Sequence, residues 1–178
     1  MILDNLIAEA RAKPMIVVMP FNIPAFAQKS GGGSRAENLA LFEPDLISEL
    51  IPFVQSRYRV RKRPQYRAIA GLSMGGEQAV TIGVRHPELF GWVGGFSAAL
   101  FSEELELRFG SFLANPAEAT KRLKLLWIGL RAAPGCQLKL RRSSQRSGIR
   151  HRYLETEGSQ IWPVWRLYLI EFVSLYSR

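Results

Sequence analysis

The feature that most constrains this chain is the pentapeptide GLSMG at residues 71–75, which lies between a short apolar segment and a helical pattern. Residues 66–70 are short and apolar enough for a buried strand, and residues 76–85 have the spacing of a helix. A turn sharp enough to join them leaves no room for side chains on its flanks, which gives a reason for glycine at positions 71 and 75. The sequence therefore predicts a strand–turn–helix unit with a serine at its apex.

This unit has the form of a nucleophile elbow, in which Ser73 projects its hydroxyl above the sheet. The backbone N–H of Met74, at the start of the following helix, would face any oxygen that gains negative charge. We therefore take Ser73 as the candidate nucleophile and Met74 as the candidate oxyanion donor. The alternative interpretation is a packed strand-to-helix turn without chemistry.

Strands and helices are expected to alternate along the chain. Further strands are predicted at residues 14–20, 92–97, 123–128 and 151–157, and helices at residues 1–12, 42–58 and 163–176. This alternation indicates an α/β protein with a mostly parallel sheet covered by helices on both faces. At 178 residues the chain is long enough for one domain.

Prolines and apolar runs give further expectations for single segments. The run at residues 14–20 is apolar throughout and bounded by prolines, as in a strand buried on both faces. Residues 21–36 are predicted to be a loop, and Pro52 should kink or break the helix around it. Residues 98–120 are expected to be irregular with some helix, and residues 131–148 show no clear pattern.

The net charge of +9 comes from one region. Ten of the 24 basic residues and no acidic residue lie in residues 121–152, which leaves 14 basic against 15 acidic residues elsewhere. An RNA- or DNA-binding patch is possible in this region, but no aromatic residue interleaves the basic residues between Arg131 and Arg150. We therefore expect no nucleic-acid partner.

Composition also argues against metals and membrane spans. Cys136 is the only cysteine and the two histidines are far apart in sequence, so we expect neither a metal nor another cofactor. No run of 18 apolar residues suggests a membrane helix. The first 13 residues include Asp4 and Glu9 and lack the order of a signal peptide, so the compartment is left open.

Two segments, AIAGLSMGG at residues 68–76 and GWVGGFS at residues 91–97, resemble an esterase family of α/β-hydrolases. That family includes feruloyl, acetylxylan and enterochelin esterases and S-formylglutathione hydrolases, and the carbohydrate-esterase branch looks most similar. Shorter matches are residues 15–20, 45–47, 125–129, 155–158 and 162–165. The resemblance covers nearly the whole chain except about residues 131–147. It implies a serine carboxylic-ester hydrolase without a cofactor, acting on a small-molecule or carbohydrate-linked ester.

The chain departs from the family pattern at the other two positions of the catalytic triad. Ser73 matches the family nucleophile, but Gln160 stands where the family has its histidine. The acid normally follows the strand matched by residues 125–129, and residues 129–134 contain no carboxylate. The resemblance also implies that the family's first strands and second oxyanion donor are missing. Residues 1–178 are thus expected to be a single, N-terminally truncated α/β-hydrolase domain.

No other side chain is expected to replace the missing base. His86 would lie roughly 19 Å from Ser73 along the helix, and His151 roughly 20 Å away at the other edge of the sheet. Glu155 and Glu157 are nearer, but a carboxylate is a poor base for a serine.

These departures lead to two hypotheses. The first is a weak or inactive esterase. The second is a non-catalytic relative that uses the pocket of the family's active site to bind a carbohydrate ester, an aryl ester or a protein partner. A shifted reading frame is one hypothesis for residues 131–147. Self-association is expected through the strand at residues 14–20, because the neighbour that the family gives it is missing.

Overall fold

The computed structural model describes residues 1–21, 34–98, 121–131, 151–157 and 161–176. The chain divides into two compact units: residues 1–15 with residues 63–178, and residues 16–62. Each unit is described by itself below. In the described parts of both units, no helix is long and apolar enough to cross a membrane.

The first unit is built on a parallel sheet. Its four described strands lie in the order β1-β2-β3-β4, and all three neighbouring pairs are parallel. The strands are β1 (Ala68–Leu72), β2 (Trp92–Phe96), β3 (Leu125–Arg131) and β4 (His151–Thr156). Leu72 pairs with Phe96 in this register, so β1 and β2 end together at the carboxyl edge of the sheet.

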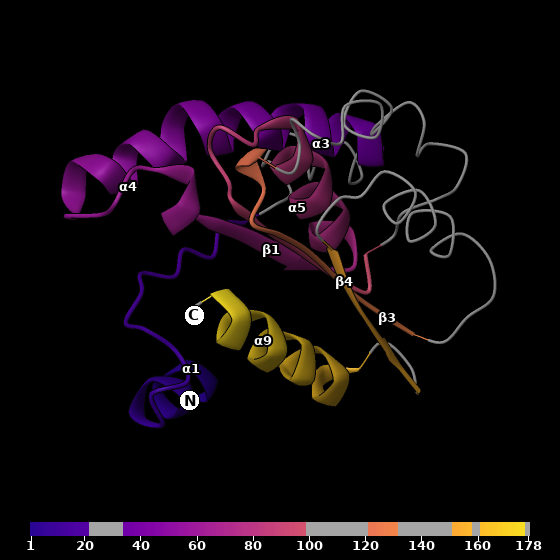
Figure 1. The fold of residues 1–178 in the computed structure, drawn as a ribbon. Coiled ribbons are helices and arrows are strands. Elements are labelled where there is room, and N and C mark those ends of the chain that lie inside the picture. Colours follow the sequence, from indigo (N-terminus) through magenta and orange to yellow (C-terminus); the bar gives the residue numbers. More distant parts are fainter. Residues whose placement is uncertain (22–33, 99–120, 132–150, 158–160, 177–178) are drawn as a thin grey trace. The chain divides into compact units, whose positions relative to one another are not determined.

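Helices cover both faces of this sheet, as predicted. Helix α5 (Met74–Arg85) lies on one side and α9 (Trp162–Tyr176) on the other (Figure 1). At Gly83 an added Cβ would come within 2.5 Å of the Val93 side chain, so glycine lets α5 approach β2 closely.

The α9 face holds an aromatic core. Phe96 and Trp127 of the sheet pack edge to face at 5.3 Å between ring centroids, and both contact Tyr168 and Phe172 of α9. Edge-to-face contacts of this kind add to the stabilisation that comes from burial alone. This cluster fixes α9 across the strands.

The N-terminal helix packs against α9. Helix α1 (Ile2–Ala8) places Leu6 in a cluster with Val173. It is shorter than the predicted helix at residues 1–12, because Ala10 adopts a left-handed conformation with φ 55°. The N–H of Arg11 then returns to the carbonyl of Leu6 at 2.8 Å, which closes the helix end.

Hydrogen bonds hold the amino edge of the sheet together. A 3-10 turn, Pro64–Tyr66, includes the first residue of the strand predicted at residues 66–70, and Arg67 follows that turn, so β1 starts only at Ala68. The Tyr176 hydroxyl donates to the carbonyl of Tyr66 at 2.7 Å, and the Trp92 indole donates to the carbonyl of Gln65 at 3.1 Å. The end of α9 is thereby tied to the start of β1.

The second unit contains a continuous helical stretch: α3 (Arg35–Pro44), a π-helical turn (Asp45–Leu50) and α4 (Ile51–Arg57). It begins earlier than predicted, because Ser34 and Glu37 form a capping box. Pro52 stands at the start of α4, and the chain widens into the π-helical turn directly before it. The change of helix type accommodates a residue that lacks an N–H.

The prediction of a strand at residues 14–20 is wrong. The structure has no strand there, and Ile16, Val17 and Val18 are about half exposed. An apolar pattern indicates a tendency to be buried, but a strand also needs a neighbour for its backbone N–H and C=O groups. Most of the segments expected at residues 98–120 and 131–148 lie outside the described residues.

Candidate functional site

The predicted strand–turn–helix unit is confirmed. β1 ends at Leu72, α5 starts at Met74, and Ser73 between them has φ 53° and ψ −117°. A serine with positive φ is strained, and such strain persists only where the surroundings impose it. The Ser73 N–H donates to the carbonyl of Phe96 at 2.8 Å, which ties the turn to β2.

Glycine is required beside the serine because backbone segments meet there. A Cβ added to Gly71 would collide with the carbonyl group of Gly75. A Cβ added to Gly76 would lie 2.9 Å from the Gly71 carbonyl oxygen and 3.1 Å from Ala98. The predicted reason for glycine at 71 is thus confirmed, and Gly76 is a further position that sequence reasoning did not assign.

A second serine with a positive φ follows the neighbouring strand. Ser97 follows β2, has φ 47°, and donates its N–H to the carbonyl of Gly129 at 2.8 Å. Because Leu72 and Phe96 are register partners, Ser73 and Ser97 follow paired residues at the carboxyl edge. Ser97 is nearly fully buried.

Ser97 belongs to a buried polar cluster between the sheet and α9. The hydroxyls of Thr156 and Tyr168 are 2.6 Å apart, and the Trp165 indole donates to Ser97 Oγ at 3.4 Å. Burial raises the pKa of Tyr168, while hydrogen bonds with Thr156 and Ser97 act in the opposite direction. Sequence reasoning missed this cluster. The available signal was that Ser97 and Thr156 both come at the ends of parallel strands.

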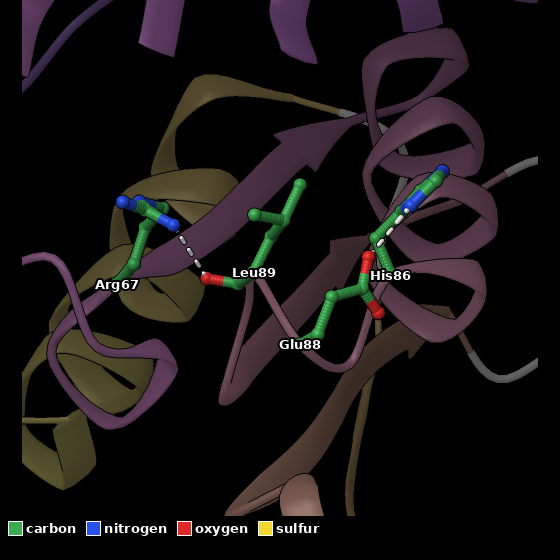
Figure 2. A network of polar contacts seen from close by, with 4 residues as sticks. All are labelled: Arg67, His86, Glu88 and Leu89. Atoms are coloured by element: carbon green, nitrogen blue, oxygen red, sulfur yellow. Dashed lines mark hydrogen bonds and ion pairs between the residues drawn. The ribbon is translucent and has the colours of Figure 1, made fainter. Parts of the chain in front are cut away.

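Neither histidine lies near the elbow. His86 follows the last residue of α5, whereas Ser73 precedes the first, and the 12-residue helix between them is about 18 Å long. The His86 ring faces the Glu88 carboxylate at 3.0 Å, and nearby Arg67 donates to the carbonyl of Leu89 at 2.9 Å (Figure 2). His86 is therefore held in the turn that leads to β2.

His151 lies at the opposite edge of the sheet from the elbow. It is the first residue of β4 and pairs with Leu126, near the start of β3. Its ring packs against Tyr153 at 5.5 Å between ring centroids. The expected separation of both histidines from Ser73 is confirmed by these positions.

Among the remaining candidate residues, Met74 lies in the described part of the chain. Met74 is the first residue of α5, so its N–H belongs to the unpaired donors of a helix start. Gln160 and Cys136 lie outside the described residues. Over the residues that the structure describes, no three potential metal ligands come together.

A buried carboxyl group near the elbow was not predicted. Glu77 is only 3% exposed, and its N–H donates to the carbonyl of Ser73 at 3.1 Å. It occupies the first turn of α5, where the helix dipole favours a negative charge.

A serine held in a strained turn between a parallel strand and a helix, in a sheet covered on both faces, defines a protein of the α/β-hydrolase type. A family model agrees with this class: the one named Esterase, "Putative esterase", matches residues 2–128. The chain therefore belongs to this esterase family and is a carboxylic-ester hydrolase-like protein.

A curated protein with an esterase name is also similar to this chain in sequence. An endo-1,4-beta-xylanase/feruloyl esterase from Xylanibacter ruminicola is 35% identical over 130 residues, which are 72% of this chain and 16% of that protein. The chain thus spans about one sixth of the length of this curated relative.

Two solved structures share the fold. A ferulic acid esterase matches with a TM-score of 0.78 at 21% identity, over 99% of this chain and 76% of that one. The enterobactin esterase FES from Shigella flexneri, solved in the presence of 2,3-dihydroxy-N-benzoyl-serine, matches with a TM-score of 0.73 at 21% identity, over 98% and 46%.

Proposed function

We propose that Ser73 is the nucleophile of a serine carboxylic-ester hydrolase whose turnover is weak. The observation that carries this proposal is the conformation of Ser73, which combines a positive φ with a position between β1 and α5. Backbone strain concentrates at reacting positions, where it aims a side chain at the substrate. Esters of phenolic acids are the proposed substrates, in keeping with the names of the relatives.

The reaction would follow two acyl-transfer steps. Ser73 Oγ attacks the ester carbonyl carbon, and the N–H of Met74 stabilises the oxygen that becomes negative. The C–O bond to the alcohol then breaks, and the alcohol leaves with the proton that the Ser73 hydroxyl gave up. Water hydrolyses the acyl-serine, which releases the acid and restores the Ser73 hydroxyl.

The weak step is the removal of the serine proton. His86 and His151 both lie too far from Ser73 to accept it, by one helix length or one strand length. Gln160, at the position of the family histidine, cannot take a proton at neutral pH. Loss of the base in a serine hydrolase lowers turnover by about 10⁴- to 10⁶-fold. Binding and the oxyanion donor can retain a small part of catalysis.

The alternative is a non-catalytic relative that binds an aryl or carbohydrate ester, or a protein partner, at this edge of the sheet. The position of both histidines favours it. The two functions differ in whether ester cleavage depends on Ser73.

The test compares p-nitrophenyl acetate with methyl ferulate as substrates. The unmodified chain should release p-nitrophenol slowly, because this leaving group departs without an acid, and Ser73→Ala should abolish the release. Ser56→Ala is the matched control, since it removes an exposed hydroxyl that bonds only to the nearby carbonyl of Phe53 at 2.8 Å. Gln160→His alone should restore little, because residues 129–134, where the family has its acid, contain no carboxylate either.

Two outcomes decide between the functions. Release that continues in Ser73→Ala contradicts the proposed nucleophile. Absence of release, together with a rise in melting temperature on adding ferulic acid, favours the binding protein.

A further inference from the structure

The start of α9 carries an exposed indole that core packing does not explain. Trp162 is 65% exposed, more than any other large apolar side chain in the described part of the first unit except Met1. Exposing a ring of this size forgoes the stabilisation that burial would give. Tryptophan is enriched at binding interfaces, because its ring system combines a large apolar surface with a hydrogen-bond donor.

The Trp162 ring is held in place by a second indole. The rings of Trp162 and Trp165 meet edge to face, with centroids 5.3 Å apart and an interplanar angle of 88°. Trp165 is half-buried, packs against the aromatic core, and donates its Nε1–H to Ser97 Oγ at 3.4 Å. The exposed ring therefore rests on one that is anchored to the sheet, which limits the entropy lost on binding.

This pair of indoles lies at the same edge of the sheet as the elbow. Ser97, which accepts the Trp165 hydrogen bond, directly follows β2, and Ser73 directly follows β1. Their preceding residues, Phe96 and Leu72, are register partners. Neighbouring strands lie about 4.8 Å apart. The hydrogen bond from Trp165 to Ser97 therefore ties the two indoles to the end of β2, which lies next to the end of β1 and Ser73.

We propose that Trp162 is a specificity-determining residue that stacks on the aromatic ring of the aryl ester whose carbonyl faces Ser73. The inference rests on the proposed function, because Ser73 supplies the reacting end of the site. An aromatic ring is preferred over an aliphatic group, since stacked and edge-to-face ring pairs gain more than their buried area provides. Trp165 acts as a positioning residue that sets the angle of the Trp162 ring.

The experiment measures binding and does not require turnover. Ferulic acid, a product of the proposed reaction, is titrated into the full chain by isothermal calorimetry, beside 3-cyclohexylpropanoic acid as an aliphatic probe. Trp162→Leu should raise the dissociation constant for ferulic acid by about twofold to tenfold, the value of an aromatic contact. Trp162→Phe, which keeps an aromatic ring, should restore most of the affinity, and the aliphatic probe should respond less to either change.

The matched control is Tyr66→Leu. Tyr66 is 42% exposed and lies in the turn before β1, at the other end of that strand from Ser73. The same aromatic-to-leucine change should leave ferulic acid binding unaltered there. Melting temperatures of all variants report whether the fold is preserved.

The inference is overturned if ferulic acid does not bind the unmodified chain, or binds Trp162→Leu equally well. It is also overturned if Trp162→Leu weakens the binding of xylobiose and leaves the binding of ferulic acid unchanged. The indole would then stack on a sugar ring of the ligand. Binding that depends on Trp162 without any Ser73-dependent hydrolysis supports the inference and contradicts the proposed function. Hydrolysis that depends on Ser73, with no effect of Trp162 on binding, does the reverse.

Discussion

The Ser73 backbone N–H donates to the carbonyl oxygen of Phe96 at 2.8 Å. This bond continues the β1–β2 pairing one residue past the end of β1, so the elbow is held by the sheet as well as by its own turn. A strained backbone survives where neighbouring contacts determine it. The pairing of these two strands therefore sets the direction of the candidate nucleophile.

The strain at Ser73 predicts an order of stability among its variants. Ser73→Gly should be more stable than Ser73→Ala by about 1 kcal/mol, because glycine tolerates a positive φ at less cost than alanine. Urea unfolding at pH 7 measures the free energies. Equal stability of the two variants would mean that the turn relaxes in the absence of the serine.

The Thr156–Tyr168 hydrogen bond predicts coupled losses of stability. Tyr168→Phe and Thr156→Val should each lower the free energy of unfolding by about 1 to 2 kcal/mol, since each leaves a buried hydroxyl with fewer partners. The double variant should lose less than the sum of the two. Strict additivity in this double-mutant cycle would show that the hydroxyls do not interact.

Tyr168, which is buried, and Tyr176, which is half-buried, predict a loss of stability in alkali. Burial raises the pKa of Tyr168 and of Tyr176, the latter against a smaller opposing effect of Arg67. The folded state thus holds these protons more tightly than the unfolded chain, in which tyrosine titrates near pH 10. Their contribution is complete below about pH 10 and declines as the pH rises above it.

Urea unfolding between pH 8 and pH 11 tests this dependence. The free energy of unfolding should fall above about pH 10, and Tyr176→Phe should flatten the fall. An unchanged slope in that variant would assign the dependence to other groups.

The exposed apolar segment of the second unit predicts self-association. Ile16, Val17 and Val18 are about half exposed, and Met19 is 88% exposed. Light scattering at moderate salt should show a mass that rises with concentration, and Val17→Lys should reduce the rise, because charge opposes apolar association. A monomer over the whole concentration range, already in the unmodified chain, would rule this out.

Local patterns in the sequence determined the elements around the elbow. Glycines at 71 and 75, the apolar strand before them and the helix after them lie within about 20 residues, so short-range sterics and periodicity are sufficient to predict them. The direction of parallel strands was enough to predict that His151 lies far from Ser73. The sequence by itself also predicted the class of protein to which the chain belongs.

Only the tertiary structure decided which long-range neighbours meet. Residues 16–18 are apolar like a buried strand and yet form none, because a strand exists only where a second backbone satisfies its hydrogen bonds. Ser97, Thr156, Trp165 and Tyr168 come together from two strands and a helix that are separated by up to 71 residues. No local pattern encodes such a meeting, since it depends on how the helix crosses the sheet.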